Sequence, residues 1–234
     1  MRAILEICVD TAAGLACAKA AGADRVELCS ALGLGGLTPS YGLMCGAGDT
    51  VLTMIRPRAG DFIWSADEVG SMVADIGIAR DLGLSGVVIG AMDRAGRLDL
   101  PVLRRLVTAA RGMDITLHRV VDLLDDPVTA VEIAADLGIN RILTSGGALR
   151  AIDGIAVLAK MAARGGVSIM AGAGLRVEDI APLAAVGIRE FHASASRCVA
   201  EDARLTKLGF APSERRETDL GIVAALKSAV TAVS

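Results

Sequence analysis

The chain has 234 residues, with 24 Lys and Arg against 27 Asp and Glu, and a net charge of −3 at pH 7. No basic run or patch occurs, which excludes nucleic acid and anionic membrane surfaces as expected partners, and no stretch of about 18 apolar residues suggests a membrane span. The length suits one large domain over residues 1–234, and because aromatic residues make up only 2% of the chain, Ala, Val, Leu, Ile and Gly must build its core.

Strand patterns alternate with helix patterns along the whole chain. The expected strands are residues 3–8, 25–29, 51–56, 86–90, 114–119, 141–145, 167–171 and 189–193. The expected helices lie near residues 11–21, 40–47, 65–82, 99–111, 127–137, 148–164, 176–186 and 219–233. This alternation predicts a parallel sheet.

A recurring phrase marks four helix-to-strand junctions: "AAGADRVEL", "DLGLSGVVI", "DLGINRILT" and "AVGIREFHA". Each places a glycine where a helix ends, followed by a strand. Eight strand–helix units predict an α/β fold, a single closed (β/α)8 TIM barrel. A doubly wound open sheet is the alternative, but no GxGxxG motif follows the first strand. Residues 197–218 break the rhythm and are expected to form an added loop.

Strand alternation places several charged side chains inside the barrel, near the carboxyl ends of the strands. Glu6 and Glu27 face inward on adjacent strands, and we expect Arg56 on the next strand to bridge them. The catalytic candidates are Glu6, Glu27, Arg56, His118 and His192; among them Glu6, Glu27 and His118 are the acid–base groups and Arg56 is a charge clamp. Barrel active sites lie at this end. A purely structural Glu–Arg–Glu network is the alternative.

Loops after the strands favour a small anionic or phosphorylated ligand. Glycine-rich turns that lead into helices expose backbone amides to anions. The expected ligand-binding residues are Arg58, Asp61, Arg119, Ser145, Gly146, Gly147, Gly172 and Gly174. Since none of the four lysines lies at a strand end, we do not expect a Schiff-base mechanism.

The five cysteines are widely spaced, with no CxxC pair and no zinc-ligand spacing. We therefore expect reduced thiols and a cytoplasmic protein. Cys8 and Cys29 share a face on neighbouring strands, where two thiolates could bind copper(I). The alternative is that both are buried and inert.

The chain resembles the copper homeostasis protein CutC family. The matching segments run in order through residues 4–196: "EICVD", "GADRVELCSAL", "GGLTPSYGL", "MIRPRAGDF", "LHRVVD", "RILTSGG", "AGAG" and "EFHASA". The resemblance implies a cytoplasmic (β/α)8 barrel that forms homodimers or higher homo-oligomers and binds copper(I) through Cys8 and Cys29. The chain departs from the family pattern in a shorter helix after Pro39 and in "LHRVVD", where an aromatic residue usually follows the His-Arg pair.

Two functions follow as hypotheses. The first is copper homeostasis with copper(I) at Cys8 and Cys29. The second is an acid–base enzyme that acts on a small anionic or phosphorylated substrate at the barrel mouth. A barrel whose polar interior is purely structural is a third possibility.

Overall fold

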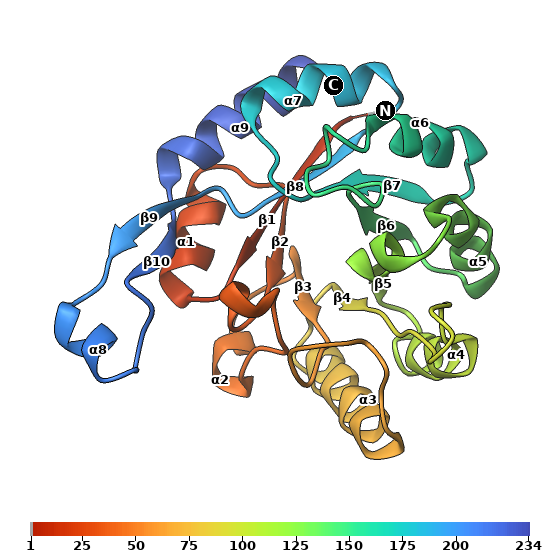
Figure 1. Ribbon diagram of the computed structural model, residues 1–234, viewed down its shortest axis with the longest axis horizontal. Coiled ribbons are helices and arrows are strands. Elements are labelled where there is room, and N and C mark those ends of the chain that lie inside the picture. The colour runs from red at the N-terminus through yellow and green to blue at the C-terminus, as the bar shows by residue number, and fades with distance from the viewer. Residues whose placement is uncertain (1) are drawn as a thin grey trace.

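The computed structural model describes residues 2–234 and confirms the closed barrel. Eight parallel strands follow one another in chain order around the barrel, and β1 pairs with β8 to close it (Figure 1). The strands are β1 Ile4–Val9, β2 Arg25–Leu28, β3 Val51–Met54, β4 Gly86–Ile89, β5 Asp114–Leu117, β6 Arg141–Thr144, β7 Ser168–Ala171 and β8 Glu190–Ala193.

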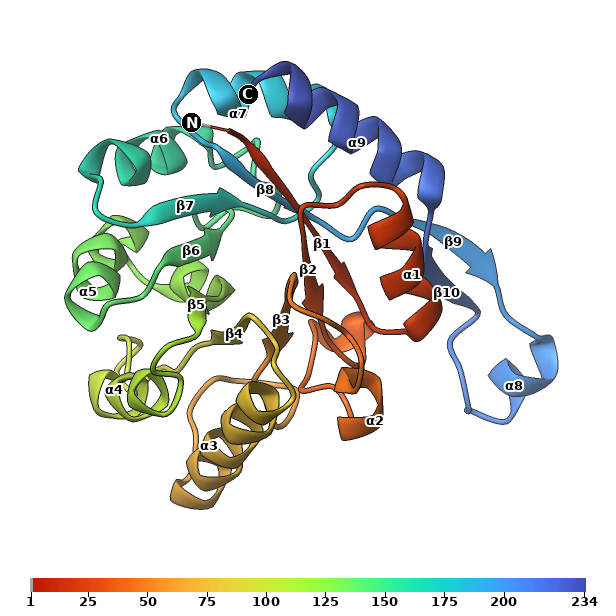
Figure 2. The same ribbon diagram turned by 180° about the vertical axis from the view of Figure 1, so that it is seen from behind.

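Helices surround this barrel on the outside (Figure 2). They are α1 Ala12–Ala20, α2 Tyr41–Met44, α3 Ala66–Asp81, α4 Leu100–Ala109, α5 Ala130–Leu137, α6 Ile155–Arg164, α7 Val177–Ala185 and α9 Leu220–Ala232. Short 3-10 turns at Leu32–Leu34, Arg119–Leu123 and Pro127–Thr129 complete the connections. The four junction glycines all adopt positive φ, as expected for helix ends: Gly22, Gly83, Gly138 and Gly187.

Two predicted helices are shorter than expected. The helix predicted at 40–47 ends at Met44, because Gly46 and Gly48 adopt positive φ and turn the chain. The helix predicted at 148–164 begins only at Ile155, after a series of turns. A Cβ at Gly154 would lie 1.9 Å from the Ser145 carbonyl oxygen, so those turns depend on a close backbone approach.

The alternation predicted for the strands is confirmed. Leu5, Ile7 and Val9 of β1 are fully buried in the core between strands and helices. Glu6 and Cys8 take the opposite face and are buried inside the barrel. The barrel interior therefore carries polar side chains together with a small apolar cluster, Cys29, Leu52, Met54 and Val88, while the main apolar core lies between the strands and the helices.

Residues 196–218 form an ordered arm, so the expectation of a loop there is wrong. β9 Ser196–Ala200 and β10 Glu214–Thr218 pair in antiparallel fashion, with α8 Ala203–Lys207 at the tip, and the arm projects from the barrel (Figure 1). Its strands carry charged side chains that pair across the ladder, for example Arg197 with Glu217 at 3.6 Å. Because both faces are exposed, the hydrophobic alternation that identifies a strand is missing here.

The two chain ends lie close together beside α9 and β1 (Figure 2): the amide of Ala3 donates to Ser234 Oγ at 3.2 Å. Across the described residues, every helix is too short or too polar to span a membrane.

Candidate functional site

A layer of paired charges fills the amino-terminal end of the barrel. Arg25 donates to both Glu6 and Glu190, and Arg141 donates to Glu190 at 2.9 Å and pairs with Asp114 at 2.8 Å. Four of these five residues are the first residue of their strand. We call Glu6, Arg25, Asp114, Arg141 and Glu190 the N-terminal charged layer.

The expected bridge from Arg56 to Glu6 and Glu27 is wrong, and the strand register explains why. β1 and β2 pair Glu6 with Arg25 and Cys8 with Glu27. The two glutamates therefore lie in different layers of the barrel, and Glu6 finds its cation at the start of β2. Arg25 shares the inward face with Glu27, two residues along β2, but the register that makes it the partner of Glu6 cannot be derived from either strand alone.

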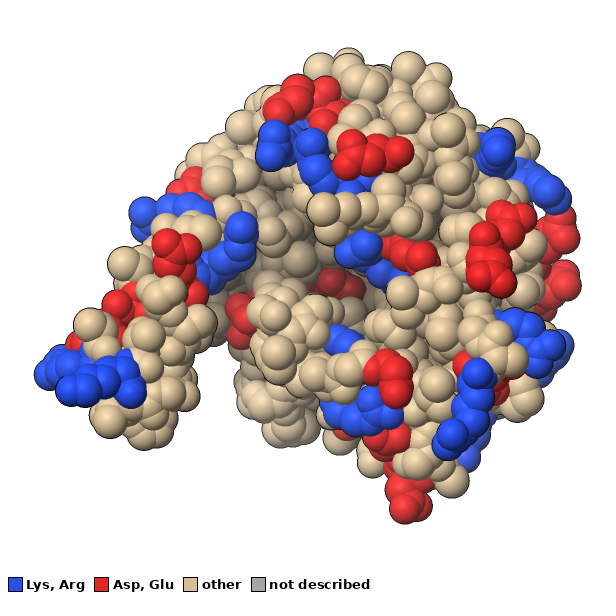
Figure 3. Space-filling model, in the orientation of Figure 1, with Lys and Arg blue, Asp and Glu red and all other residues tan. Residues whose placement is uncertain are grey.

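A second polar group lies at the carboxyl ends of the strands and lines a cavity of about 850 Å³. The surface is hollowed there, with acidic and basic side chains around the opening (Figure 3). We call Cys8, Glu27, Arg56, His118 and His192 the mouth cluster; all are buried.

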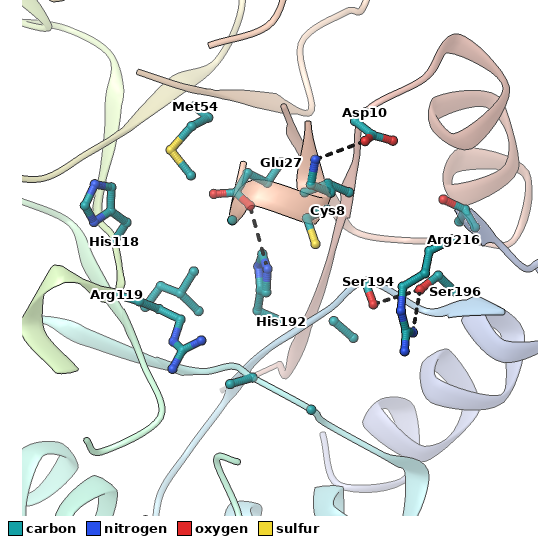
Figure 4. Close-up of a pocket in the computed structure, with 18 of the residues that line it drawn as sticks. Cys8, Asp10, Glu27, Met54, His118, Arg119, His192, Ser194, Ser196 and Arg216 are labelled. Atoms are coloured by element: carbon teal, nitrogen blue, oxygen red, sulfur yellow. Dashed lines mark hydrogen bonds and ion pairs between the residues drawn. The ribbon is translucent and has the colours of Figure 1, made fainter. Parts of the chain in front are cut away.

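His192 links the two layers. Its Nδ1 lies 2.8 Å from Glu6 Oε1. Its Nε2 lies 3.7 Å from Glu27 Oε2, as Figure 4 shows. Burial lowers the pKa of this imidazole, but Cys8, Glu6 and Glu27 outweigh that effect and raise the pKa well above its ordinary value. Burial raises the pKa of Glu6, yet Arg25 and His192 lower it overall to about 2. Glu6 is therefore a fixed carboxylate that orients the His192 ring.

Glu27 has the opposite character. Burial raises the pKa of its carboxyl to about 7, although His192 acts to lower it. Its Oε1 is buried and has no hydrogen-bond partner among the described residues. A carboxyl group that is partly protonated near neutral pH and has a free oxygen is equipped either to move a proton or to bind a cation.

Cys8, Glu27 and His192 together form a candidate metal centre. Each offers one ligand atom, and these three atoms all lie within 4.8 Å of one another. Cys29, which we expected to share an ion with Cys8, does not belong to this group of three. It packs with Leu52 and Met54, and burial, followed by the charge of Glu27, raises the pKa of its thiol well above the ordinary value.

Arg56 faces the cavity but binds backbone rather than carboxylates. Its guanidinium donates to the carbonyl oxygens of Leu34 at 2.9 Å, Gly36 at 3.1 Å and Gly60 at 2.9 Å. It also lies 4.8 Å from the centre of the Phe62 ring. Arg56 thus joins two loops over the barrel mouth.

His118 follows β5 directly and also contacts Phe62, with 4.8 Å between the ring centres. Its ring rests against Gly90, where a Cβ would come within 2.1 Å of the imidazole. Gly90 is therefore the residue that makes room for His118 at the end of β4.

Of the predicted ligand-binding residues, Arg58 and Asp61 lie outside the cavity lining. Arg58 pairs with Asp61 at 2.9 Å and with Glu68, and its guanidinium lies 4.9 Å from the Trp64 ring. Their charges are used to hold the loop after β3 against the start of α3.

The backbone amides after β6 were expected to bind an external anion. They instead bind a carboxylate of the same chain, that of Asp122. The Asp122 carboxylate accepts from the amides of Ser145 and Gly147, both at 3.0 Å, and from the Ser145 hydroxyl at 3.0 Å. Ser145, Gly146 and Gly147 do not line the cavity. Arg119 does line it, and its guanidinium also pairs with Asp122 at 2.7 Å.

The turn after β7 contributes in two ways. Gly174 lines the cavity. Gly172 does not, but a Cβ there would lie 2.5 Å from Leu143 and 3.2 Å from His192, so Gly172 allows the His192 ring to pack.

Sequence reasoning missed several cavity residues. Asp10 and Met54 line the cavity, and strand alternation by itself places both on the inward face, so the sequence pattern could have identified them. Arg216 reaches the cavity from the arm, where its Nη1 lies 3.3 Å from Ser196 Oγ (Figure 4). Arg216 could not be predicted as a cavity residue, because the sequence pattern did not identify the arm that brings it to the barrel mouth.

Comparisons with known proteins agree with this architecture. Residues 3–197 match the CutC family. CutC proteins from Caulobacter vibrioides and Sinorhizobium medicae are 50% and 48% identical; the match covers 99% and 100% of this chain and 98% of each relative. A solved structure from Streptococcus agalactiae, a CutC protein whose proposed role is copper homeostasis, is similar with a TM-score of 0.76. It is 27% identical, and the match covers 82% of this chain and 98% of that one. The chain belongs to the CutC family.

Proposed function

From membership of the CutC family and from the mouth cluster, we propose that the protein binds copper(I) as part of copper homeostasis. The ligands are Cys8 Sγ and His192 Nε2, with the Glu27 carboxylate as the third donor. The observation that carries this proposal is the convergence of these three buried ligand atoms within 4.8 Å. Thiolate and imidazole are donors that suit copper(I).

The layer below supports this ligand set. Because Glu6 Oε1 lies 2.8 Å from His192 Nδ1, it accepts the hydrogen bond from Nδ1–H and keeps that proton in place. The groups around His192 raise its pKa well above the ordinary value, so metal binding releases the other proton, the one on Nε2, and that nitrogen becomes the ligand. Arg25 in turn pairs with Glu6 and keeps it charged. A carboxylate behind a ligating histidine fixes the ring and raises the basicity of the ligand.

A copper(I) competition titration with a chromophoric chelator tests the proposal. We expect Cys8→Ser and His192→Gln each to weaken binding about 10-fold to 100-fold or more, while Cys29→Ser changes it little. Cys198→Ser is the matched control, because this thiol is exposed on the arm. Loss of binding in Cys29→Ser but not in His192→Gln would replace this ligand set with the two-thiol site expected from the sequence.

The cavity favours a second candidate function, acid–base catalysis on a small anionic molecule. A volume of about 850 Å³ exceeds what a single ion requires, and two residues of its lining, Glu27 and His118, each have a buried polar atom without a hydrogen-bond partner in the described chain, Oε1 and Nε2 respectively. In this role Glu27 is the general base or acid, a contribution of typically about 10²–10⁴-fold in rate. A metabolite screen by thermal shift on wild type and Glu27→Gln tests it. The function requires a ligand that stabilises the wild type and is turned over only when Glu27 is present.

We also propose a cytoplasmic, homo-oligomeric protein. All five cysteines are free thiols, which suits a reducing compartment. The arm presents Leu208 and Phe210, which are 68% and 77% exposed, as an apolar surface for a second copy of this chain. Light scattering on the purified protein tests the oligomeric state.

A further inference from the structure

The hydrogen bonding of His118 determines which of its nitrogens carries the proton. The backbone amide of Val120 donates to His118 Nδ1 at 3.1 Å. Nδ1 must therefore present its lone pair, and a neutral imidazole with that arrangement carries its single proton on Nε2. His118 is held as the Nε2–H tautomer by its own backbone turn.

This ring stays neutral at physiological pH. His118 is only 4% exposed, and burial, reinforced by the positive charge of Arg56, lowers its pKa to about 3. A histidine with this pKa does not exchange protons near neutrality. The expectation that His118 serves as a general acid or base therefore gives way to a different role, that of a hydrogen-bond donor.

The donor has no acceptor within the protein. Nε2 of His118 is buried and lacks a hydrogen-bond partner among the described residues, and so does Nε of Arg56. Both residues line the cavity, and both contact the Phe62 ring from a distance of 4.8 Å. Buried donors without acceptors are costly, about 1–3 kcal/mol each, so a paired state with a ligand is favoured.

Arg56 adds an uncompensated positive charge to this position. Its side chain is 5% exposed, its hydrogen bonds go to carbonyl oxygens, and no carboxylate of residues 2–234 forms an ion pair with it. Buried guanidinium groups are normally paired with an anion. Arg56 and His118 both line the cavity and both contact the Phe62 ring, so the unbalanced charge and the donor without an acceptor lie near each other.

We propose that His118 is a fixed hydrogen-bond donor, through Nε2–H, to an anionic oxygen of a small molecule whose charge is balanced by Arg56. The group it binds is a carboxylate or a phosphate, and the position is separate from the Cys8–Glu27–His192 group. This inference rests on the second candidate function, the small-ligand site, and assigns the chemical class of its ligand.

The tautomer can be read directly in the wild-type protein. The chain contains only two histidines, so long-range ¹⁵N–¹H spectra of the imidazoles are simple to assign, with His192→Gln as the reference. We expect His118 to show Nε2–H and to hold that state from pH 8 down to pH 5. An Nδ1–H tautomer, or protonation near pH 6.5, would overturn the inference without any variant of His118.

Ligand binding is tested with inorganic phosphate and with acetate as probes. In the wild type, we expect at least one of them to shift the His118 resonances saturably, and the one that binds identifies the anion source. His118→Gln places an amide donor near the position of Nε2, while His118→Asn keeps only the acceptor for Val120. Asn should weaken probe binding about 10-fold, and Gln should stay within about 3-fold of wild type.

Equal affinities in the Asn and Gln variants, or no saturable shift with either probe, would contradict the donor role. Copper(I) titration of the same variants separates this result from the proposed metal function, since both variants should keep wild-type copper(I) affinity. Glu27→Gln tests the catalytic role of the small-ligand site independently, because His118 Nε2 makes no hydrogen bond to Glu27.

Discussion

The two polar layers inside this barrel differ in whether their charges are paired. In the N-terminal charged layer each of the five residues has at least one ion-pair partner in the layer. The mouth cluster instead holds three of the four buried side-chain polar atoms that lack a partner in the described chain: Glu27 Oε1, Arg56 Nε and His118 Nε2. Buried charges that satisfy one another stabilise the barrel, whereas unsatisfied ones mark where a ligand belongs.

Glu6 and Glu27 show this difference in a single residue type. They lie one layer apart on adjacent strands, yet the pKa is about 2 for Glu6 and about 7 for Glu27. Both are buried, so desolvation is common to them, and the Arg25 guanidinium together with the hydrogen bond to His192 lowers the pKa of Glu6. Environments that separate the pKa values of two carboxyl groups are typical of sites where each has its own task.

The largest effect is expected from breaking the paired layer. Arg25→Met leaves Glu6 and Glu190 buried without their shared cation, which should lower the free energy of unfolding by about 3–5 kcal/mol. Urea denaturation measures this, and Arg2→Met is the control, because the Arg2 side chain is 73% exposed and its pair with Asp24 should contribute less than about 1 kcal/mol. Similar losses in the two variants would show that the layer is not a structural unit.

The next largest effect concerns the contribution of Glu6 to the free energy of unfolding, which should depend on pH. Because folding lowers the pKa of Glu6 from 4.5 to about 2, the unfolded state binds the proton more readily. The stabilisation is complete above pH 4.5 and is lost as the pH falls towards 2. Glu6→Gln should therefore cost up to about 3 kcal/mol at pH 7, with a difference from wild type that shrinks over that window. Urea denaturation at a series of pH values measures it; a constant difference would argue against the shifted carboxyl.

The pH dependence of stability that comes from Glu27 should have the opposite sign to that from Glu6. Folding raises its pKa from 4.5 to about 7, so the metal-free wild type loses stability as the pH rises from 4.5 through 7. Glu27→Gln removes that loss and should be more stable than wild type by about 1–3 kcal/mol at pH 8, with no pH-dependent gain below pH 4.5. The same denaturation series, without copper, measures it. If Glu27→Gln is less stable than wild type at pH 8, the Glu27 carboxylate stabilises the fold, as Glu6 does, and the prediction is wrong.

The smallest effect on stability is expected outside both layers, on the arm. Phe210→Ser changes a side chain that is 77% exposed, so the free energy of unfolding should stay within about 0.5 kcal/mol of wild type. If the arm joins two copies, light scattering should show a smaller assembly for this variant. If the wild type is oligomeric and Phe210→Ser has the same mass, the interface between copies does not involve this part of the arm.

Much of the fold could be predicted from local patterns. Alternating strands, helix-ending glycines such as Gly83 and Gly138, and apolar outward positions on β1 led to the correct barrel. The arm could not be predicted, because β10 is charged on both faces and β9 is largely exposed, so neither strand shows hydrophobic alternation. The amides after β6 were read as an anion site, since nothing near them in sequence reveals that Asp122 occupies them.

The sequence by itself determined the barrel and the inward direction of Glu6, Glu27, His118 and His192, because alternation and glycine conformation are local properties of the chain. Only the tertiary structure decided their roles. The register between β1 and β2 pairs Arg25 with Glu6 and places Glu27 opposite Cys8. Burial then separated the pKa values, and the Val120 amide chose the His118 tautomer. Pairing, desolvation and tautomer depend on neighbours that are distant along the chain or on exact backbone geometry, and only the folded barrel brings these together.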